Sequence, residues 1–291
     1  SFSDFSQSSE RIYCVVDVGG GMRGIYGAGV FDRCIDDKVT FDYGIGVSAG
    51  SANISSFMAG QRGRNKVFFG DYSFRKDYMS FRNFIKKGSY LDVEYIYGAL
   101  SNADGEYPLD YEKIIANPME FVIVASEAVS GKTKYFHKSD IHQDDYGVFK
   151  ASSSIPVVCK PFYIKGTAYY DGALGDPVPV QKALDDGCDK LVVVLTKPRD
   201  TVRQPEKDTK LAKLLKRKYP KASYNMAHRA ERYNKGVDLA KKLEKEGNAI
   251  IVAPDSIEGM KTLTTSHEAF DMLYKKGYND GAVIKSFVSG N

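Results

Sequence analysis

The stretch GIGVSAGS, residues 44–51, places Ser48 between two glycines, Gly46 and Gly50. An apolar run, FDYGIGV, precedes the serine, and small residues from 49 to 58 follow it. This G-x-S-x-G pattern between a strand and a helix is typical of a nucleophile elbow, in which both glycines avoid collisions with neighbouring backbone. The alternative is a glycine-rich turn without chemistry, because short motifs recur by chance.

The first sixty residues of the chain alternate between strand and helix. RIYCVVDV predicts a strand that enters a glycine turn, GGGMRG, at residues 19–24. A helix follows, and the candidates for its apolar face are Ile25, Ala28, Val30 and Cys34. Strand, helix, strand and helix in this order predict parallel strands with a crossover helix.

The same alternation continues along the chain, which predicts an α/β fold with a mostly parallel sheet. FVIVASEA reads as a third strand with KTKYFH beside it, and residues 161–173 as a hairpin that turns at 165–167. KLVVVLT and AIIVAP are further strands. YGVFKASSSIP, residues 146–156, predicts a short helix that Pro156 stops, and further helices are expected at 180–187, 208–218, 222–246 and 266–288. Residues 65–118 lack clear periodicity and are interpreted as short helices and loops forming a cap or lid.

The glycine turn DVGGGMRG can present backbone N–H groups to an anion, either a phosphate or a developing oxyanion. Its Gly19-x-Gly21-x-x-Gly24 spacing also fits the dinucleotide fingerprint. A dinucleotide site requires an acidic residue where the second strand ends, but Val47 and Ser48 occupy that place.

A third motif, YYDGALGDPVP, delivers Asp171 at the end of an aromatic strand, from which a carboxylate could reach a serine hydroxyl. The alternative is a common Asp-Gly turn. Asp176 lies outside the motif and is not expected to act.

In their order, GGGMRG, GVSAG and DGA resemble the motifs of the patatin-like phospholipase family over roughly the first 200 residues. The resemblance implies a three-layer α/β/α fold, a single domain over residues 1–291, and a basic helical part, 197–291, that completes the sheet. It implies a serine acyl hydrolase that acts on phospholipids or other acyl lipids without metal or organic cofactor.

The resemblance also implies roles for individual residues. Ser48 would be the nucleophile and Asp171 the general base, with burial raising the carboxyl pKa. The oxyanion hole would come from the loop, Gly19, Gly20, Gly21 and Met22. Structural motif positions would be Arg23, Gly24, Gly46, Gly50 and Gly172. No histidine is expected in the site, and His137 and His142 are interpreted as ordinary surface or loop residues.

Composition narrows the remaining choices. The first ten residues, SFSDFSQSSE, lack a signal pattern, so a cytoplasmic location is expected. Cys14, Cys34, Cys159 and Cys188 show no metal spacing and are expected to be buried reduced thiols.

Positive charge is concentrated near the C-terminus. Residues 197–246 hold 16 Lys and Arg against 7 Asp and Glu, a net of +9, whereas the whole chain is +4. Within them, KLAKLLKRKYPK predicts a basic helix with Leu211, Leu214 and Leu215 on one side. The functional interpretation is peripheral contact with an anionic membrane. The alternative is a solvated helix whose leucines pack on the sheet. Nothing in the segment indicates nucleic-acid binding.

Two other functions stay open from sequence: an acyltransferase that uses the same acyl-enzyme, and a phosphate- or nucleotide-binding protein in which Ser48 is structural. Head-group preference, acyl length and oligomeric state are not predicted.

Overall fold

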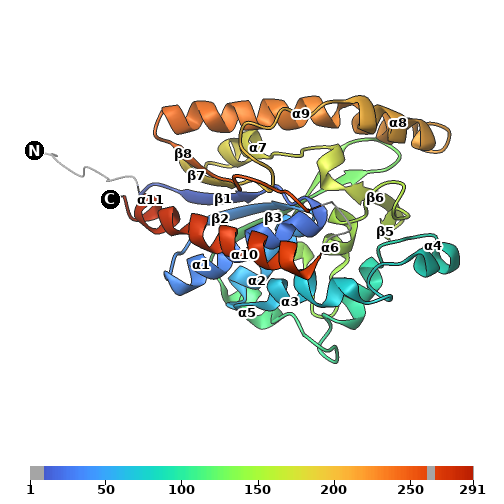
Figure 1. The fold of residues 1–291 in the computed structure, drawn as a ribbon, viewed down its shortest axis with the longest axis horizontal. Helices are drawn as coiled ribbons and strands as arrows, with labels where there is room; N and C mark the ends of the chain where they lie inside the picture. The colour runs from blue at the N-terminus through green and yellow to red at the C-terminus, as the bar shows by residue number, and fades with distance from the viewer. Residues whose placement is uncertain (1–9, 261–265, 291) are drawn as a thin grey trace, which may run out of the picture.

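The computed structural model describes residues 10–260 and 266–290. Within these ranges, eight strands form one sheet, mostly parallel, with helices on both faces (Figure 1). The strand order is β5-β6-β3-β2-β1-β7-β8, and β4 pairs with β3. The strands are β1 (Tyr13–Asp17), β2 (Tyr43–Val47), β3 (Glu120–Glu127), β4 (Thr133–His137), β5 (Phe162–Ile164), β6 (Thr167–Asp171), β7 (Lys190–Val194) and β8 (Ala249–Val252). The predicted three-layer α/β class is confirmed.

Helices form the two outer layers. In Figure 1, α7 and α9 cover one face of the sheet, while α1, α2 and α10 cover the other. The helices are α1 (Ile25–Asp36), α2 (Ala49–Met58), α3 (Arg64–Gly70), α4 (Phe81–Lys87), α5 (Tyr111–Ala116), α6 (Gly147–Ser152), α7 (Val180–Asp185), α8 (Glu206–Leu215), α9 (Pro220–Lys245), α10 (His267–Asp280) and α11 (Ile284–Ser289). Short turns are η1 (Gly21–Gly24), η2 (Tyr72–Phe74), η3 (Tyr95–Ala99), η4 (Lys138–Asp140), η5 (Gly172–Leu174) and η6 (Gly281–Val283). Across the described ranges, every helix is too short or too polar to cross a bilayer.

The central strands are apolar on both sides because both faces of the sheet are covered. Along β1, Val15 packs into the core on the α1 and α10 side. Its neighbours Cys14 and Val16 pack into a second core with α7 and α9. This alternation is the two-residue period of a strand.

Pairing brings the turns of the site to one edge. Asp17, at the end of β1, pairs with Gly46 of β2 and with Val194 of β7, all in parallel register. Because the carboxyl ends of parallel strands share one edge, the turns that follow these strands are neighbours. On β3, Ala125 pairs with Asp171 of β6, so the hairpin carries Asp171 toward the same edge.

The expectation of reduced thiols is wrong for two cysteines. Cys14 of β1 and Cys188, just before β7, form a disulfide, with their Cα atoms 6.0 Å apart. The physical reason is the strand order: β1 and β7 are hydrogen-bonded neighbours, although the cysteines are 174 residues apart in sequence. Cys34 and Cys159 are buried free thiols, as expected.

The alternative that the leucines of the basic helix pack on the sheet holds for two of the three. Helix α8 packs along α9 (Figure 1). Leu215 is buried in a core cluster with residues of α9 and β6, and Leu211 packs against that cluster, but Leu214 is 68% exposed. The three leucines therefore do not form one apolar face.

Candidate active site

Ser48 lies on a strained turn between β2 and α2, with φ 55° and ψ −123°. Its side chain makes no capping hydrogen bond to the helix, although Ser48 is the N-cap residue. Its backbone N–H donates to Ser152 Oγ at 2.8 Å, which fixes the turn on α6. A Cβ at Gly46 would meet the backbone of Ser51 at 2.5 Å, and one at Gly50 would overlap the Asp17 carbonyl. The hydroxyl is thus held at a helix N-terminus without serving the helix.

The glycine loop after β1 runs through Gly19, Gly20 and Gly21 with φ of 68°, 131° and 60°, a path that favours glycine. Two side chains hold it. Asp17 accepts the Gly19 N–H at 2.9 Å, and the Thr196 hydroxyl donates to the Gly19 carbonyl at 2.5 Å. Within the described ranges, the N–H groups of Gly20, Gly21 and Met22 make no hydrogen bond. They are available to an anion at the cavity wall.

Asp17 is a fully buried carboxylate beneath this loop. Besides the Gly19 N–H, it accepts a hydrogen bond from Asn53 Nδ2 at 3.0 Å, and the same amide donates to the Gly24 carbonyl at 2.9 Å. Burial raises the pKa of Asp17 to about 6, partly opposed by these hydrogen bonds. The pair therefore ties the loop to the helix that follows Ser48.

Asp171 ends β6 and faces Ser48. Its carboxylate accepts the Ala173 N–H at 2.9 Å and lies on the same cavity as Ser48. Burial raises its pKa to about 6, while the Ala173 N–H, the Ser48 side chain and Arg229 act in the opposite direction. A Cβ at Gly172 would overlap the Val124 carbonyl, so glycine is required after the aspartate.

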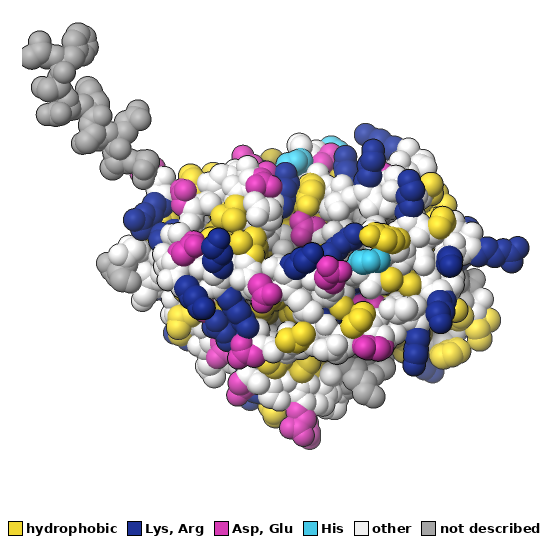
Figure 2. Space-filling model, turned by 90° about the horizontal axis from the view of Figure 1, so that it is seen from above, with side chains coloured by type: hydrophobic (Ala, Val, Ile, Leu, Met, Phe, Trp, Pro, Cys, Tyr) yellow, Lys and Arg dark blue, Asp and Glu magenta, His cyan; other side chains and the backbone are white. Residues whose placement is uncertain are grey.

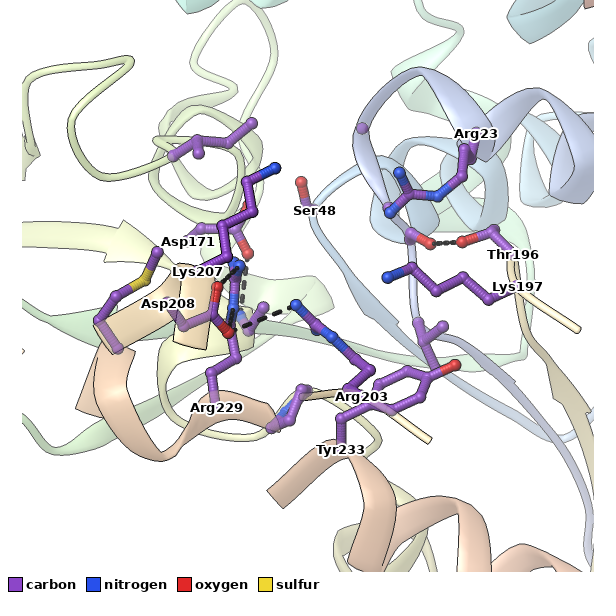
Figure 3. Close-up of a pocket in the computed structure, with 18 of the residues that line it drawn as sticks. Arg23, Ser48, Asp171, Thr196, Lys197, Arg203, Lys207, Asp208, Arg229 and Tyr233 are labelled. Atoms are coloured by element: carbon purple, nitrogen blue, oxygen red, sulfur yellow. Dashed lines mark hydrogen bonds and ion pairs between the residues drawn. The ribbon is translucent and has the colours of Figure 1, made fainter. Parts of the chain in front are cut away.

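Ser48 and Asp171 open into a cavity of about 540 Å³ (Figure 3). The glycine loop, Arg23 and the chain after β7 form one side of it, and residues of α8 and α9 lie with Asp171 on the other side (Figure 3). Five cationic side chains line the cavity: Arg23, Lys197, Arg203, Lys207 and Arg229. The cavity therefore combines a serine–carboxylate pair with a strongly positive wall.

Asp208 of α8 organises part of this wall. Buried Asp208 accepts two hydrogen bonds from Arg229, at 2.7 and 3.2 Å, and lies 3.5 Å from Arg203. Burial lowers the pKa of Lys197 to about 7, and Arg203, Arg23 and Arg229 lower it further. Asp208 only partly offsets their repulsion.

An apolar slot reaches Ser48 from the other side. Met22 and Ala49, next to Ser48, form one side of the slot, and side chains from residues 69–97 form the other. Ile155 borders both the slot and the cavity. Its free volume is about 20 Å³. Phe69, Tyr78, Leu91 and Ile96 supply its buried apolar lining. Ser48 thus lies between a cationic and an apolar compartment.

The structure places most of the predicted residues together. Ser48, Asp171, Gly19, Gly20, Gly21 and Arg23 line the cavity, and Met22 lines the slot. Gly24, Gly46, Gly50 and Gly172 lie behind them, where each allows close backbone packing. Asp176 instead accepts a hydrogen bond from Tyr135 at 2.6 Å, and neither His137 nor His142 lines the cavity or the slot.

Sequence reasoning missed the residues that support the loop and the cationic wall. Asp17 could have been found as an acidic residue that ends an apolar strand directly before glycines. Thr196 and Lys197 lie two and three residues after the end of β7, so the rule that strand carboxyl ends share an edge would have indicated them. Arg203, Asp208 and Arg229 have no comparable signal. The helices that carry Asp208 and Arg229 were predicted, but the sequence did not indicate where they pack against the sheet.

Comparisons with known proteins agree with this arrangement. The family model described as patatin-like phospholipase matches residues 18–184, and one described as a domain of unknown function (DUF6363) matches residues 219–285. The uncharacterized protein YjjU of Escherichia coli (strain K12) is 28% identical over 207 residues, 65% of this chain and 53% of that protein. The chain therefore spans about half the length of this curated relative.

Among solved structures, VipD from Legionella pneumophila aligns with a TM-score of 0.47 at 14% identity, over 95% of this chain and 67% of that one. At this score the likeness is loose, and the assignment comes from the family model. That model covers more than half of the chain, including all three motifs. The chain belongs to the patatin-like phospholipase family.

Proposed function

We propose that this protein is a serine acyl hydrolase that cleaves acyl esters of phospholipids or lysophospholipids through a Ser48–Asp171 dyad. Family membership supports lipid acyl hydrolysis in general terms. The observation that carries the specific proposal is the strained Ser48 turn, whose hydroxyl does not cap its own helix and shares the cavity with the buried carboxylate of Asp171.

In the proposed reaction, Asp171 accepts the Ser48 proton as Oγ attacks the ester carbonyl carbon. The tetrahedral intermediate collapses, the alcohol leaves with the proton from Asp171, and an acyl-enzyme remains. Asp171 then accepts a proton from water, which attacks the acyl carbonyl, and the proton returns to Ser48 as the acid is released. A carboxylate with a pKa of about 6 is a stronger base than an ordinary aspartate.

The oxyanion donors that we propose are the N–H groups of Gly20, Gly21 and Met22. Gly19 fits this role less well than the sequence motif implies, because its N–H already donates to Asp17. Preformed backbone donors in a site shielded from water are effective because they need no reorganisation during the reaction.

We assign the acyl chain to the apolar slot beside Ser48. Its 20 Å³ holds about one or two water molecules, so residues 69–97 must move apart for a chain to enter. This requirement supports the prediction that 65–118 acts as a lid. The single-domain organisation and the cytoplasmic location also remain predictions, and residues 1–9, on which the latter partly rests, lie outside the described residues.

The test is hydrolysis of p-nitrophenyl esters of several chain lengths by the wild type, Ser48→Ala and Asp171→Asn. We expect losses of about a thousandfold or more for both variants. Asp176→Asn is the matched control, because Asp176 is a nearby carboxylate bonded to Tyr135 and should keep most of the rate. A fluorophosphonate that labels the wild type but not Ser48→Ala would identify the nucleophile. Full activity in folded Ser48→Ala would exclude the proposal.

A further inference from the structure

The cavity beside Ser48 is lined by more cationic side chains than carboxylates. Five cations and two carboxylates, Asp171 and Asp208, line it. Four of the cations come from residues 197–229, so the basic segment contributes part of its charge to the cavity; Lys197, Arg203 and Arg229 are partly buried there, and Lys207 is exposed at the rim. Like charges gathered in a partly buried space repel one another, and a bound anion would relieve that repulsion.

Lys197 and Lys207 are the clearest indication. Neither makes a hydrogen bond or ion pair with any residue in the ranges 10–260 and 266–290. In Figure 3, the Lys197 ammonium points toward the middle of the cavity, and the Lys207 side chain extends past Asp171 to the level of Ser48. Since Asp208 is occupied by Arg203 and Arg229, no carboxylate of the cavity wall is free to pair with the two lysines.

The same wall offers little to a cationic group. Asp208 is engaged by two arginines, and Asp171 faces Ser48. The ring of Tyr233 lies beneath the Arg203 guanidinium, 5.3 Å from its centre, so it does not present that face to a quaternary ammonium. A choline or ethanolamine group would therefore meet positive charge without a compensating partner.

Resting on the proposed function, we propose that this cavity is a head-group subsite for the phosphate of an anionic acyl lipid, preferably a phosphomonoester without a compensating cation. Lys197 and Lys207 contact the phosphate, and Arg203 supports them from the wall. The glycerol ester then reaches Ser48 while the acyl chain points into the apolar slot on the other side.

The surface around the cavity fits such a substrate. Figure 2 looks onto the α8 and α9 face, where Lys and Arg predominate toward the end that carries α8. Exposed cations such as Lys210 and Lys213 belong to this surface but do not line the cavity. They would attract any anionic lipid surface, whereas the cavity would discriminate between head groups.

The test compares oleoyl-lysophosphatidic acid with oleoyl-lysophosphatidylcholine, which share an acyl chain, in neutral detergent micelles at pH 6.5. We expect the wild type to favour the phosphomonoester in kcat/KM. Lys197→Met should lower that preference by about ten- to a hundredfold, because a charge-assisted hydrogen bond to phosphate is lost. Lys210→Met, an exposed change on α8, is the matched control and should leave the preference within about twofold.

A second readout does not need turnover. Ser48→Ala is titrated calorimetrically with dioctanoyl-phosphatidic acid, dioctanoyl-phosphatidylcholine and inorganic phosphate. We expect binding of the first, weaker binding of the second, and loss of the difference when Lys197→Met is added. If inorganic phosphate binds as tightly as the acidic lipid, the cavity is a site for free phosphate, and the head-group assignment is wrong.

The two proposals fail separately. Hydrolysis that depends on Ser48 but shows the same head-group preference in the wild type and Lys197→Met would overturn the subsite alone. Selective binding of phosphatidic acid that requires Lys197, in a protein that hydrolyses no ester, would support the subsite and overturn the proposed hydrolase.

Discussion

Two regions meet at the cavity and are built on different principles. The turns after β1, β2 and β6 depend on backbone geometry, because their glycines have positive φ or contact neighbouring backbone. The wall from 197 to 229 depends on charge, because long side chains from a loop and two helices converge on one space. One added methyl group in the turns should therefore destabilise the fold strongly. Removal of one cation from the wall should lower only substrate recognition, by a smaller amount.

The largest effect should come from Gly50→Ala in the turn region. The new Cβ would overlap the Asp17 carbonyl, and strand and helix must separate to admit it. We expect a cost of about 3 kcal/mol or more in the free energy of unfolding, measured with urea. Gly70→Ala is the control, since a Cβ there meets nothing closer than 3.8 Å. Equal stability of the two variants would remove the distinction between the regions.

The second prediction concerns the stability of Asp171→Asn. The folded-state pKa of about 6 exceeds the ordinary 3.8, so the charged carboxylate destabilises the fold above pH 6. That cost has largely gone at pH 4, where the folded state holds the proton and the unfolded chain is about half protonated, and it is absent only below about pH 3. Asp171→Asn should therefore raise the free energy of unfolding by about 3 kcal/mol at pH 8 and by about 0.5 kcal/mol at pH 4.

Chemical denaturation at both pH values measures this difference. Asp104→Asn, at an exposed position, should change neither value. A variant that is less stable than the wild type at pH 8 would show that Asp171 is held by favourable interactions stronger than its cost of burial.

The third prediction is the acid limb of the rate profile on a neutral ester. Asp171 must be ionised to accept the Ser48 proton, and it is faced by the Ala173 N–H and by Arg229. With a pKa of about 6, kcat/KM should fall about fiftyfold between pH 6 and pH 4. Stopped-time assays with p-nitrophenyl butyrate measure the limb. A rate that stays flat to pH 4.5 in folded protein would place the base elsewhere.

The smallest effect should be an alkaline limb that only the phosphomonoester shows. Lys197 has a pKa of about 7. Burial and the charges of Arg203, Arg23 and Arg229 lower it, and Asp208 raises it by less. Its charge is present below pH 7 and is lost above it, so kcat/KM for lysophosphatidic acid should fall about fivefold between pH 7 and pH 8.

The neutral ester provides the comparison for this limb, since it has no phosphate for Lys197 to contact and should not respond to the charge of Lys197. If the same decline appears with p-nitrophenyl butyrate, the alkaline limb reports the reaction itself rather than recognition by the wall. In Lys197→Met the decline should be absent with both substrates.

The contrast between the regions also explains what the sequence could predict. Gly46, Ser48 and Gly50 carry the signature of one local turn, because backbone crowding restricts residue type at fixed spacing. Alternating strands and helices likewise predicted the fold class. Lys197 and Arg229 carry no such signature, since any position near the cavity can supply a cation.

Strand order was the main missing information. The pairing of β1 with β7 could not be predicted from local patterns, and it determines two features. It places Cys14 beside Cys188, and it brings Thr196 against the glycine loop. Both were missed for the same reason, although the residues themselves were visible in the sequence.

The disulfide has a consequence for chain continuity. Because it joins Cys14 to Cys188, a single protease cut anywhere between them leaves the two fragments covalently connected. Residues 65–118 lie entirely inside this loop. A protein nicked there would migrate as one species on a non-reducing gel and as two after reduction, with its serine and aspartate on different fragments. The nicked form would therefore show whether lid and hydrolysis can be uncoupled while the molecule stays in one piece.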